Sequence, residues 1–194
     1  MRLFVAVFPP PEALTHLSGL VDRLAVSRAH ARVSPPERWH LTLAFLGEVP
    51  DEAADSATAA LNAVTGTCGE LSITGGGKFG HGRSTVLWTG LDGDVDGLVR
   101  LGREVRRELR ARRLHPDDKR FQPHLTLARP GDRLPASALH GDLELLRNYC
   151  GPNWAVRELV LVRSELGPRP SYHPLTASAL RAEEGRDPSY RNAR

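Results

Sequence analysis

Two copies of one tetrapeptide carry side chains that can transfer protons. The sequence His-Leu-Thr-Leu occurs at residues 40–43 and again at residues 124–127 of the 194-residue chain. Imidazole titrates near pH ~6.5, so one ring can accept a proton near neutrality while another donates one. Each such transfer contributes roughly 10²–10⁴ in rate. Two threonine hydroxyls can hydrogen-bond phosphate oxygens on which charge develops. The pair of motifs therefore indicates acid–base attack on a phosphodiester without a metal.

The alternation within each motif predicts a β-strand. His40 and Thr42 would lie on one face of their strand, with the leucines on the other. His124 and Thr126 would be arranged in the same way. A single strand histidine is more often structural than catalytic, but two in repeated contexts favour a functional role. Two such strands facing each other would place both imidazoles and both hydroxyls around one cavity.

Other chemistries find less support in the sequence. The chain has eight histidines but no His-Glu-x-x-His motif and no paired-cysteine motif, and two histidines leave a catalytic zinc ion short of ligands. No Gly-x-Ser-x-Gly sequence marks a nucleophilic serine. The glycine-rich stretch 75–82 has no Gly-Lys-Ser/Thr ending and no helix directly after it, so we interpret it as a mobile hairpin loop. We therefore expect no metal and no cofactor.

The composition is that of an ordinary soluble globular protein. Apolar residues make up 40% and charged residues 25%, and the length fits one domain or two small lobes that share a core. No apolar run approaches the ~20 residues of a membrane span, and residues 1–10 lack the features of a signal peptide. Cys68 and Cys150 are too few for a disulfide framework. We expect a cytoplasmic protein that does not associate with membranes.

The net charge is mildly basic, at +3 with a pI near 9.2. Lys78 and Lys119 are the only lysines, and arginine suits bidentate phosphate binding. Coding bias explains most of these arginines, which leaves a phosphate role for one or two. The arginines of residues 95–112 are expected to form the solvated face of a helix.

The hydrophobic patterns predict alternating strands and helices. Strands are expected over residues 3–8, 31–33, 39–46, 68–74, 83–91, 121–128, 154–163 and 172–180, and helices over 12–28, 51–64, 95–112 and 134–146. Asp51 is a plausible helix N-cap. The motif positions indicate two similar lobes, each an antiparallel sheet backed by helices with its motif strand central. We expect one domain over residues 1–181 and a flexible tail over 182–194.

These features resemble the two-histidine (2H) phosphoesterase superfamily, and within it the RNA 2′,3′-cyclic phosphodiesterases, also called 2′-5′ RNA ligases of the LigT/ThpR type. The likeness runs in order from residue 2 to about residue 180. Four segments carry it: Arg2-x-Phe4-Val5-Ala6, the first motif with Phe45-Leu46-Gly47, Pro123 to Arg129, and a closing hairpin with Ser164, Gly167 and Tyr172.

The resemblance implies a bilobal α+β fold in which two antiparallel sheets face a central cleft and helices pack outside. It implies metal-independent hydrolysis of RNA 2′,3′-cyclic phosphate ends to 2′-phosphate. Members of the family also join tRNA halves reversibly through a 2′-5′ linkage. The implied partners are RNA ends of this kind and cyclic nucleotides, and we expect a monomer.

The resemblance also implies roles for the motif residues. His40 would be the general acid that protonates the leaving O3′, and His124 the general base that activates water. The near symmetry of the motifs leaves the opposite assignment open. Thr42 and Thr126 would bind phosphate oxygens, and Arg129 would pair with the phosphate.

Base recognition and the exact substrate are less constrained. An aromatic ring can stack on the terminal base of a single-stranded RNA. Phe8 and Tyr172 are the candidates, while Phe4 is expected in the core. One alternative is a phosphodiesterase for another cyclic phosphate, such as ADP-ribose 1″,2″-cyclic phosphate. Another is a catalytically silent RNA-end-binding module, although binding alone would not require two proton-transfer groups.

Overall fold

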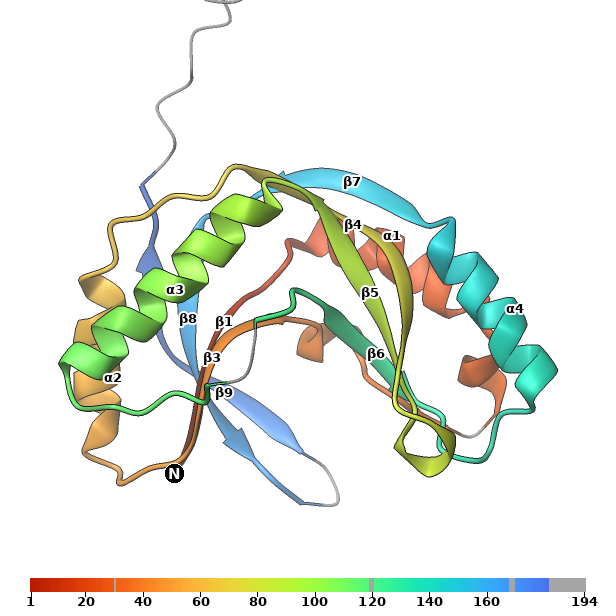
Figure 1. Cartoon of the computed structure of the whole chain (residues 1–194), viewed down its shortest axis with the longest axis horizontal. Coiled ribbons are helices and arrows are strands. Elements are labelled where there is room, and N and C mark those ends of the chain that lie inside the picture. Colours follow the sequence, from red (N-terminus) through yellow and green to blue (C-terminus); the bar gives the residue numbers. More distant parts are fainter. Residues whose placement is uncertain (30, 119–120, 168–169, 182–194) are drawn as a thin grey trace, which may run out of the picture.

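The fold consists of two antiparallel sheets with helices on their outer sides (Figure 1). A computed structural model describes residues 1–29, 31–118, 121–167 and 170–181. The tail expected at 182–194 lies outside the described residues. The predicted α+β fold with two antiparallel sheets is confirmed. No helix in the described ranges is long and apolar enough to cross a bilayer.

The four-stranded sheet forms one lobe. In spatial order its strands are β3 (Leu41–Glu48), β1 (Arg2–Val7), β8 (Glu158–Glu165) and β9 (Ser171–Ala179). Helix α2 (Ala53–Asn62) contacts β8 and β9, and α3 (Val95–Ala111) contacts β3. The predicted alternation of the first strand is confirmed, because Leu3 and Val5 enter the main core while Phe4 and Ala6 join a separate buried cluster. Phe4 lines the cleft, so this smaller cluster forms the cleft face of the sheet.

The five-stranded sheet forms the other lobe. In spatial order its strands are β2 (Arg32–Val33), β6 (Leu125–Arg129), β5 (Val86–Gly93), β4 (Glu70–Phe79) and β7 (Cys150–Ala155). Helix α4 (Ala136–Arg147) packs on β4, and α1 (Pro11–Val21) packs on β7 and β4. The two lobes are interwoven along the chain. Helix α1 follows β1 but covers the other sheet, and α3 follows β5 but covers β3.

The motif strands are not central, which corrects the expectation from the sequence. Strand β3 is the edge of its sheet, and β6 is flanked on its outer side by the two-residue β2. The outer edge of β3 is instead closed by hydrogen bonds from elsewhere in the chain. The Nε of Arg106 donates to the Leu43 carbonyl (2.9 Å), and the amide of Asp117 donates to the Phe45 carbonyl (2.8 Å). Arg106, expected on a solvated helix face, therefore protects a strand edge.

The glycine-rich stretch was also predicted incorrectly. Residues 75–79 belong to strand β4 rather than to a loop, and β5 begins at Val86. A Cβ on Gly76 would lie 2.6 Å from the Trp88 carbonyl oxygen, and one on Gly77 would lie 2.9 Å from the Trp88 ring. Glycine is needed here because the partner strand approaches closely.

Three smaller expectations change as well. The single strand expected over 154–163 is two strands, β7 and β8. The first helix ends at Val21, and a short 3₁₀ helix, Ala25–Arg28, follows it. The N-cap of α2 is Glu52, whereas Asp51 pairs with the terminal amine of Met1 at 3.1 Å.

Candidate active site

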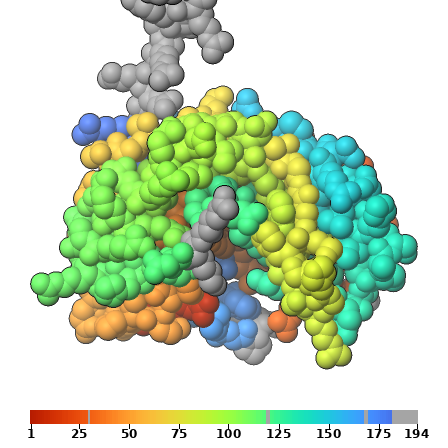
Figure 2. All heavy atoms as spheres, in the orientation of Figure 1, coloured from red at the N-terminus to blue at the C-terminus, as the bar shows by residue number. Residues whose placement is uncertain are grey.

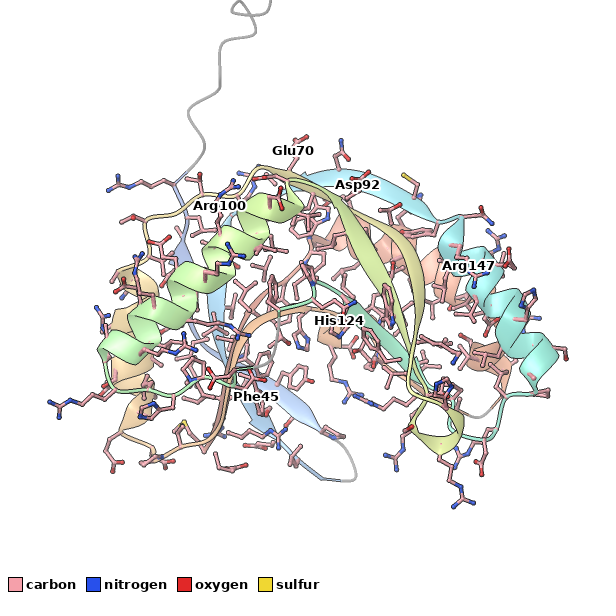
Figure 3. All side chains as sticks on the ribbon, viewed as in Figure 1. Phe45, Glu70, Asp92, Arg100, His124 and Arg147 are labelled. Atoms are coloured by element: carbon pink, nitrogen blue, oxygen red, sulfur yellow. The ribbon has the colours of Figure 1, made fainter. Side chains whose placement is uncertain are left out.

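Residues from both sheets line one cavity of about 380 Å³, called here the active-site cavity. Figure 2 shows this face of the molecule hollowed between the two lobes. The first sheet contributes His40 and Thr42, and the second contributes His124, Thr126 and Arg129. His124 lies near the middle of the molecule, between the sheets (Figure 3). The structure thus brings together the five residues predicted as catalytic or phosphate-binding.

Both motifs contain the same β-bulge, at their final leucine. Along β3 the register passes from Thr42 to Ala44 while β1 advances by one residue, which leaves Leu43 as the extra residue. Along β6 it passes from Thr126 to Ala128 while β5 advances by one residue, which leaves Leu127 extra. A bulge reverses the facing of the residues that follow it. The third residue after each threonine therefore faces the cleft, although strict alternation would turn it away.

That third residue differs between the motifs. In the second motif it is Arg129, and in the first it is Phe45; both line the active-site cavity. The guanidinium of Arg2, from the neighbouring strand β1, lies over the Phe45 ring with its carbon 4.8 Å from the ring centre. The second motif thus places its own cation, Arg129, at this position. On the first sheet the nearby cation is Arg2, which comes from a neighbouring strand.

The two histidines are oriented by the same backbone device. The Nδ1 of His40 lies 2.7 Å from the carbonyl oxygen of Arg38, and the Nδ1 of His124 lies 2.7 Å from that of Gln122. A carbonyl oxygen can only accept, so both Nδ1 atoms carry hydrogen. No described residue hydrogen-bonds either Nε2 atom. Each ring therefore presents Nε2 for proton transfer.

Aromatic rings surround His40. Its ring centre lies 4.9 Å from that of Phe4, 5.7 Å from that of Phe8 and 5.2 Å from that of Tyr172, the last edge-on. Tyr172 lines the active-site cavity, whereas Phe8 lines a different hollow next to α1. Phe4 is buried, as expected from the sequence.

A second aromatic group lies against His124. Phe79 meets His124 edge-on at 5.1 Å between ring centres and stacks on Trp88 at 5.0 Å. Trp88 lies 6.5 Å from His124. The sequence analysis missed both residues. The close packing of Gly77 under Trp88 makes their arrangement possible, and that contact is not visible in a single strand.

The active-site cavity is rich in positive charge. Arg2 and Arg38 line it together with Arg129, and the sequence analysis assigned neither of the first two to the site. In the described ranges no carboxylate forms an ion pair with any of these three. The one acidic residue recorded in the lining, Glu165, is bound to Arg163. The cavity is therefore suited to an anion with more than one negative charge.

Burial lowers the pKa of His40 below its ordinary value, and the charge of His124 lowers it further. The hydrogen bond to the Arg38 carbonyl raises the pKa of His40; this effect is smaller than that of burial but larger than that of the His124 charge. Protonation of His40 is thus disfavoured while His124 is charged. A bound phosphate would favour the imidazolium forms, because opposite charges stabilise each other.

The described residues contain no group of three or more His, Cys, Asp or Glu side chains placed to hold a metal ion. The cavity offers imidazole, hydroxyl and guanidinium groups instead. Cys68 and Cys150 are not joined in a disulfide, and neither lines the active-site cavity.

Known proteins resemble this chain in sequence and in fold. Residues 9–168 match the model of the 2′-5′ RNA ligase superfamily. The RNA 2′,3′-cyclic phosphodiesterase of Thermus thermophilus is 34% identical over 203 residues, covering 96% of this chain and 94% of its own. The Archaeoglobus fulgidus protein of the same name is 31% identical over 182 residues, covering 90% and 98%.

Solved structures show the same architecture. TT0787 of Thermus thermophilus superposes with a TM-score of 0.73 at 32% identity, covering 94% of this chain and all of that one (100%). LigT of Escherichia coli in complex with 3′-AMP superposes with a TM-score of 0.73 at 26% identity, covering 92% and 97%.

Proposed function

The chain belongs to the 2′-5′ RNA ligase superfamily, and from that premise we propose that it hydrolyses RNA 2′,3′-cyclic phosphate ends to 2′-phosphate ends. The observation that carries this proposal is the meeting of two His-x-Thr pairs in one cavity, with both Nε2 atoms unbound by described residues. Curated relatives over nearly the whole chain are RNA 2′,3′-cyclic phosphodiesterases. That activity needs one proton acceptor and one proton donor on opposite sides of a phosphate.

The residues divide the reaction between the two sheets. The hydroxyls of Thr42 and Thr126 and the guanidinium of Arg129 hold the non-bridging oxygens as charge builds up. Nε2 of His124 takes a proton from water, and the water oxygen attacks phosphorus. The bond from phosphorus to O3′ breaks, and Nε2 of His40 donates its proton to O3′. The product carries a 2′-phosphate and a 3′-hydroxyl.

The environment of His40 is compatible with the acid role once substrate is bound. A lowered pKa makes the imidazolium of His40 a stronger acid, but it also makes that form less populated near neutral pH. The cyclic phosphate is an anion and lies between the two rings, so it favours protonation of His40. We therefore propose that substrate binding supplies the protonated acid.

The terminal nucleoside has a place beside the phosphate. LigT of Escherichia coli has been crystallised with 3′-AMP and with ATP, which supports nucleotide binding in this fold. We propose that Tyr172, which lines the active-site cavity next to His40, stacks on the terminal base. Phe8 is also close to the His40 ring but lines another hollow, so it is the weaker candidate.

The same chemistry permits ligation. If a 5′-hydroxyl replaces water as the nucleophile, expulsion of O3′ leaves a 2′-5′ phosphodiester. We propose that tRNA halves are substrates of this kind. Both motifs come from one chain, so we also propose that the monomer is active.

A defined RNA with a 2′,3′-cyclic phosphate end tests the proposal. In the presence of EDTA, the protein is expected to release only the 2′-phosphate isomer, while His40→Ala and His124→Ala lose turnover. A 3′-phosphate product would contradict expulsion of O3′, and full activity of either variant would rule out the two-histidine mechanism. A higher kcat/KM for ADP-ribose 1″,2″-cyclic phosphate would favour the alternative substrate. Tight binding of the RNA end without turnover would identify a silent binding module.

A further inference from the structure

A second hollow, of about 500 Å³, shares part of its wall with the active-site cavity. It lies where the start of β1 meets the end of β8. The residues common to both walls are Arg2, Ser164, Glu165 and Leu166. Arg38 and Arg129 line only the active-site cavity of the two. Arg2 is thus the cavity arginine that stands at the boundary between the two spaces.

The strand register separates Arg2 from the position of the reacting phosphate. Thr42 lies opposite Ala6, whereas Arg2 lies opposite Glu48. Four residues of strand correspond to about 13 Å along β1. The guanidinium folds back over Phe45, three residues beyond Thr42. The guanidinium of Arg2 therefore lies on the side of the threonines that faces the second hollow.

The charge of Arg2 is not used by the mechanism described above. In the proposed mechanism the reacting phosphate is bound by Arg129, which holds the position on the second sheet that Phe45 holds on the first. Glu48 faces Arg2 across the strand pair but forms no ion pair with it, and Glu165 is bound to Arg163. A guanidinium held against an aromatic ring keeps its donors directed outward for an anion.

The second hollow itself has a mixed lining without a surplus of cations. Besides the shared residues it is lined by Met1, Glu48 and Arg163, and Arg163 is paired with Glu165. Leu166 is 68% exposed and lines both hollows, so it offers an apolar contact there. Such a surface suits a nucleoside, with an apolar contact for the base and polar groups for the sugar, better than a phosphate.

We propose that Arg2 binds the phosphodiester on the 5′ side of the terminal nucleotide, and that the second hollow receives the preceding nucleoside. This inference rests on the proposed function, because it names the next unit of the same substrate. The enzyme is then adapted to oligonucleotides of at least two residues rather than to cyclic mononucleotides.

The test compares a 2′,3′-cyclic mononucleotide with a dinucleotide that ends in the same base and the same cyclic phosphate. A charge-assisted contact corresponds to about tenfold or more in kcat/KM in favour of the dinucleotide. Arg2→Gln is expected to reduce that ratio toward one, through loss on the dinucleotide. The matched control is Arg103→Gln, an exposed arginine on α3 outside both hollows, which is expected to keep the wild-type ratio.

Two results with the wild type and Arg2→Gln would overturn the inference but not the proposed function. One is equal kcat/KM of the wild type on both substrates. The other is an equal loss by Arg2→Gln on both, which would place Arg2 at the reacting phosphate or in support of Phe45. Arg2→Lys serves as the test variant if Arg2→Gln proves unstable in thermal unfolding. It keeps a cation over the ring, so it should retain part of the kcat/KM ratio. A ratio of one in a folded Arg2→Lys protein would also count against the proposal. Failure of the wild type to open either substrate would refute the proposed function itself.

Discussion

The Nε of Arg106 donates a hydrogen bond of 2.9 Å to the main-chain carbonyl of Leu43. Leu43 is the bulged residue of the first motif, and the bulge turns Phe45 into the cleft. A second nitrogen of the same guanidinium binds the carbonyl of Asp117 at 2.9 Å. One arginine on α3 therefore joins the bulged strand edge to the segment that leads to the second motif.

Replacement of Arg106 should damage both stability and activity. Arg106→Ala leaves two carbonyl groups without their donor, at an expected cost of about 1–3 kcal/mol in the free energy of unfolding. The bulge also loses its anchor, so kcat/KM should fall. Denaturant unfolding and steady-state kinetics measure the two effects. Arg103→Ala, on the exposed face of the same helix, should change neither, and an unaltered unfolding free energy in Arg106→Ala would show that the edge needs no such closure.

The threonine hydroxyls should matter at the transition state more than in binding. Thr42→Val and Thr126→Val keep the branched shape that suits a strand but remove the donor. Loss of one such donor corresponds to roughly 10²–10³ in kcat. KM should change much less than kcat, because the contact strengthens as charge develops. A valine variant with a raised KM and an unchanged kcat would assign its threonine to ground-state binding only.

The ionisation of His40 gives a prediction that needs no turnover. Its pKa is lowered by burial and by the charge of His124. An NMR titration should therefore find the His40 midpoint below its ordinary ~6.5. His124→Gln removes one lowering effect, so the midpoint should move upward in that variant, and inorganic phosphate should move it upward in the wild type. A midpoint unaffected by either change would mean that neither the charge of His124 nor a bound anion acts on His40.

The same shift predicts how stability depends on pH. Because the folded pKa of His40 lies below the unfolded value, the unfolded chain binds the proton more tightly. The contribution of neutral His40 is complete above the unfolded pKa of about 6.5 and is lost as the pH falls through the folded pKa. His40→Gln lacks this term. The difference in unfolding free energy between wild type and His40→Gln should therefore shift against the wild type on acidification below about pH 6.5, and a difference that stays constant would contradict the shift.

The residues of the two motifs were predictable because the threonine and both leucines of each motif lie in one strand, with the histidine directly before it. Period-two alternation separates His40 and Thr42 from the buried leucines, and the structure has the same separation in both copies. Strict alternation alone would turn Arg129 away from the cavity. Its facing depends on the bulge at Leu127, which is a property of pairing with β5 and not of the motif.

Residues supplied by other strands could not be found in this way. Arg2 reaches the cavity because β1 pairs with β3, and Arg38 because the segment before β3 turns toward the β8–β9 connection, where it binds the Pro170 carbonyl at 3.3 Å. Strand order depends on hydrogen bonds between distant segments, so the edge position of β3 was also beyond local patterns. A glycine-rich stretch suggests a loop because glycine is conformationally permissive. Here the glycines are needed for another reason, which is the close approach of Trp88 on the facing strand.

Gly77 provides the sharpest test of that cause. A methyl group at this position would lie 2.9 Å from the indole of Trp88. That rigid ring also stacks on Phe79, so it can relieve the clash only by moving as a whole. Trp88 stacks on Phe79, and Phe79 meets His124 edge-on, so the displacement reaches His124, the proposed general base. Gly77→Ala should lower stability by about 1–3 kcal/mol through overpacking, and it should lower kcat by up to about 10²-fold, because small misplacements of a catalytic group are costly. The control is Gly19→Ala on α1, where nothing lies within 4 Å of the new methyl group and alanine favours the helix. If Gly77→Ala keeps the wild-type kcat while the NMR signals of His124 stay in place, the aromatic pair does not orient the base.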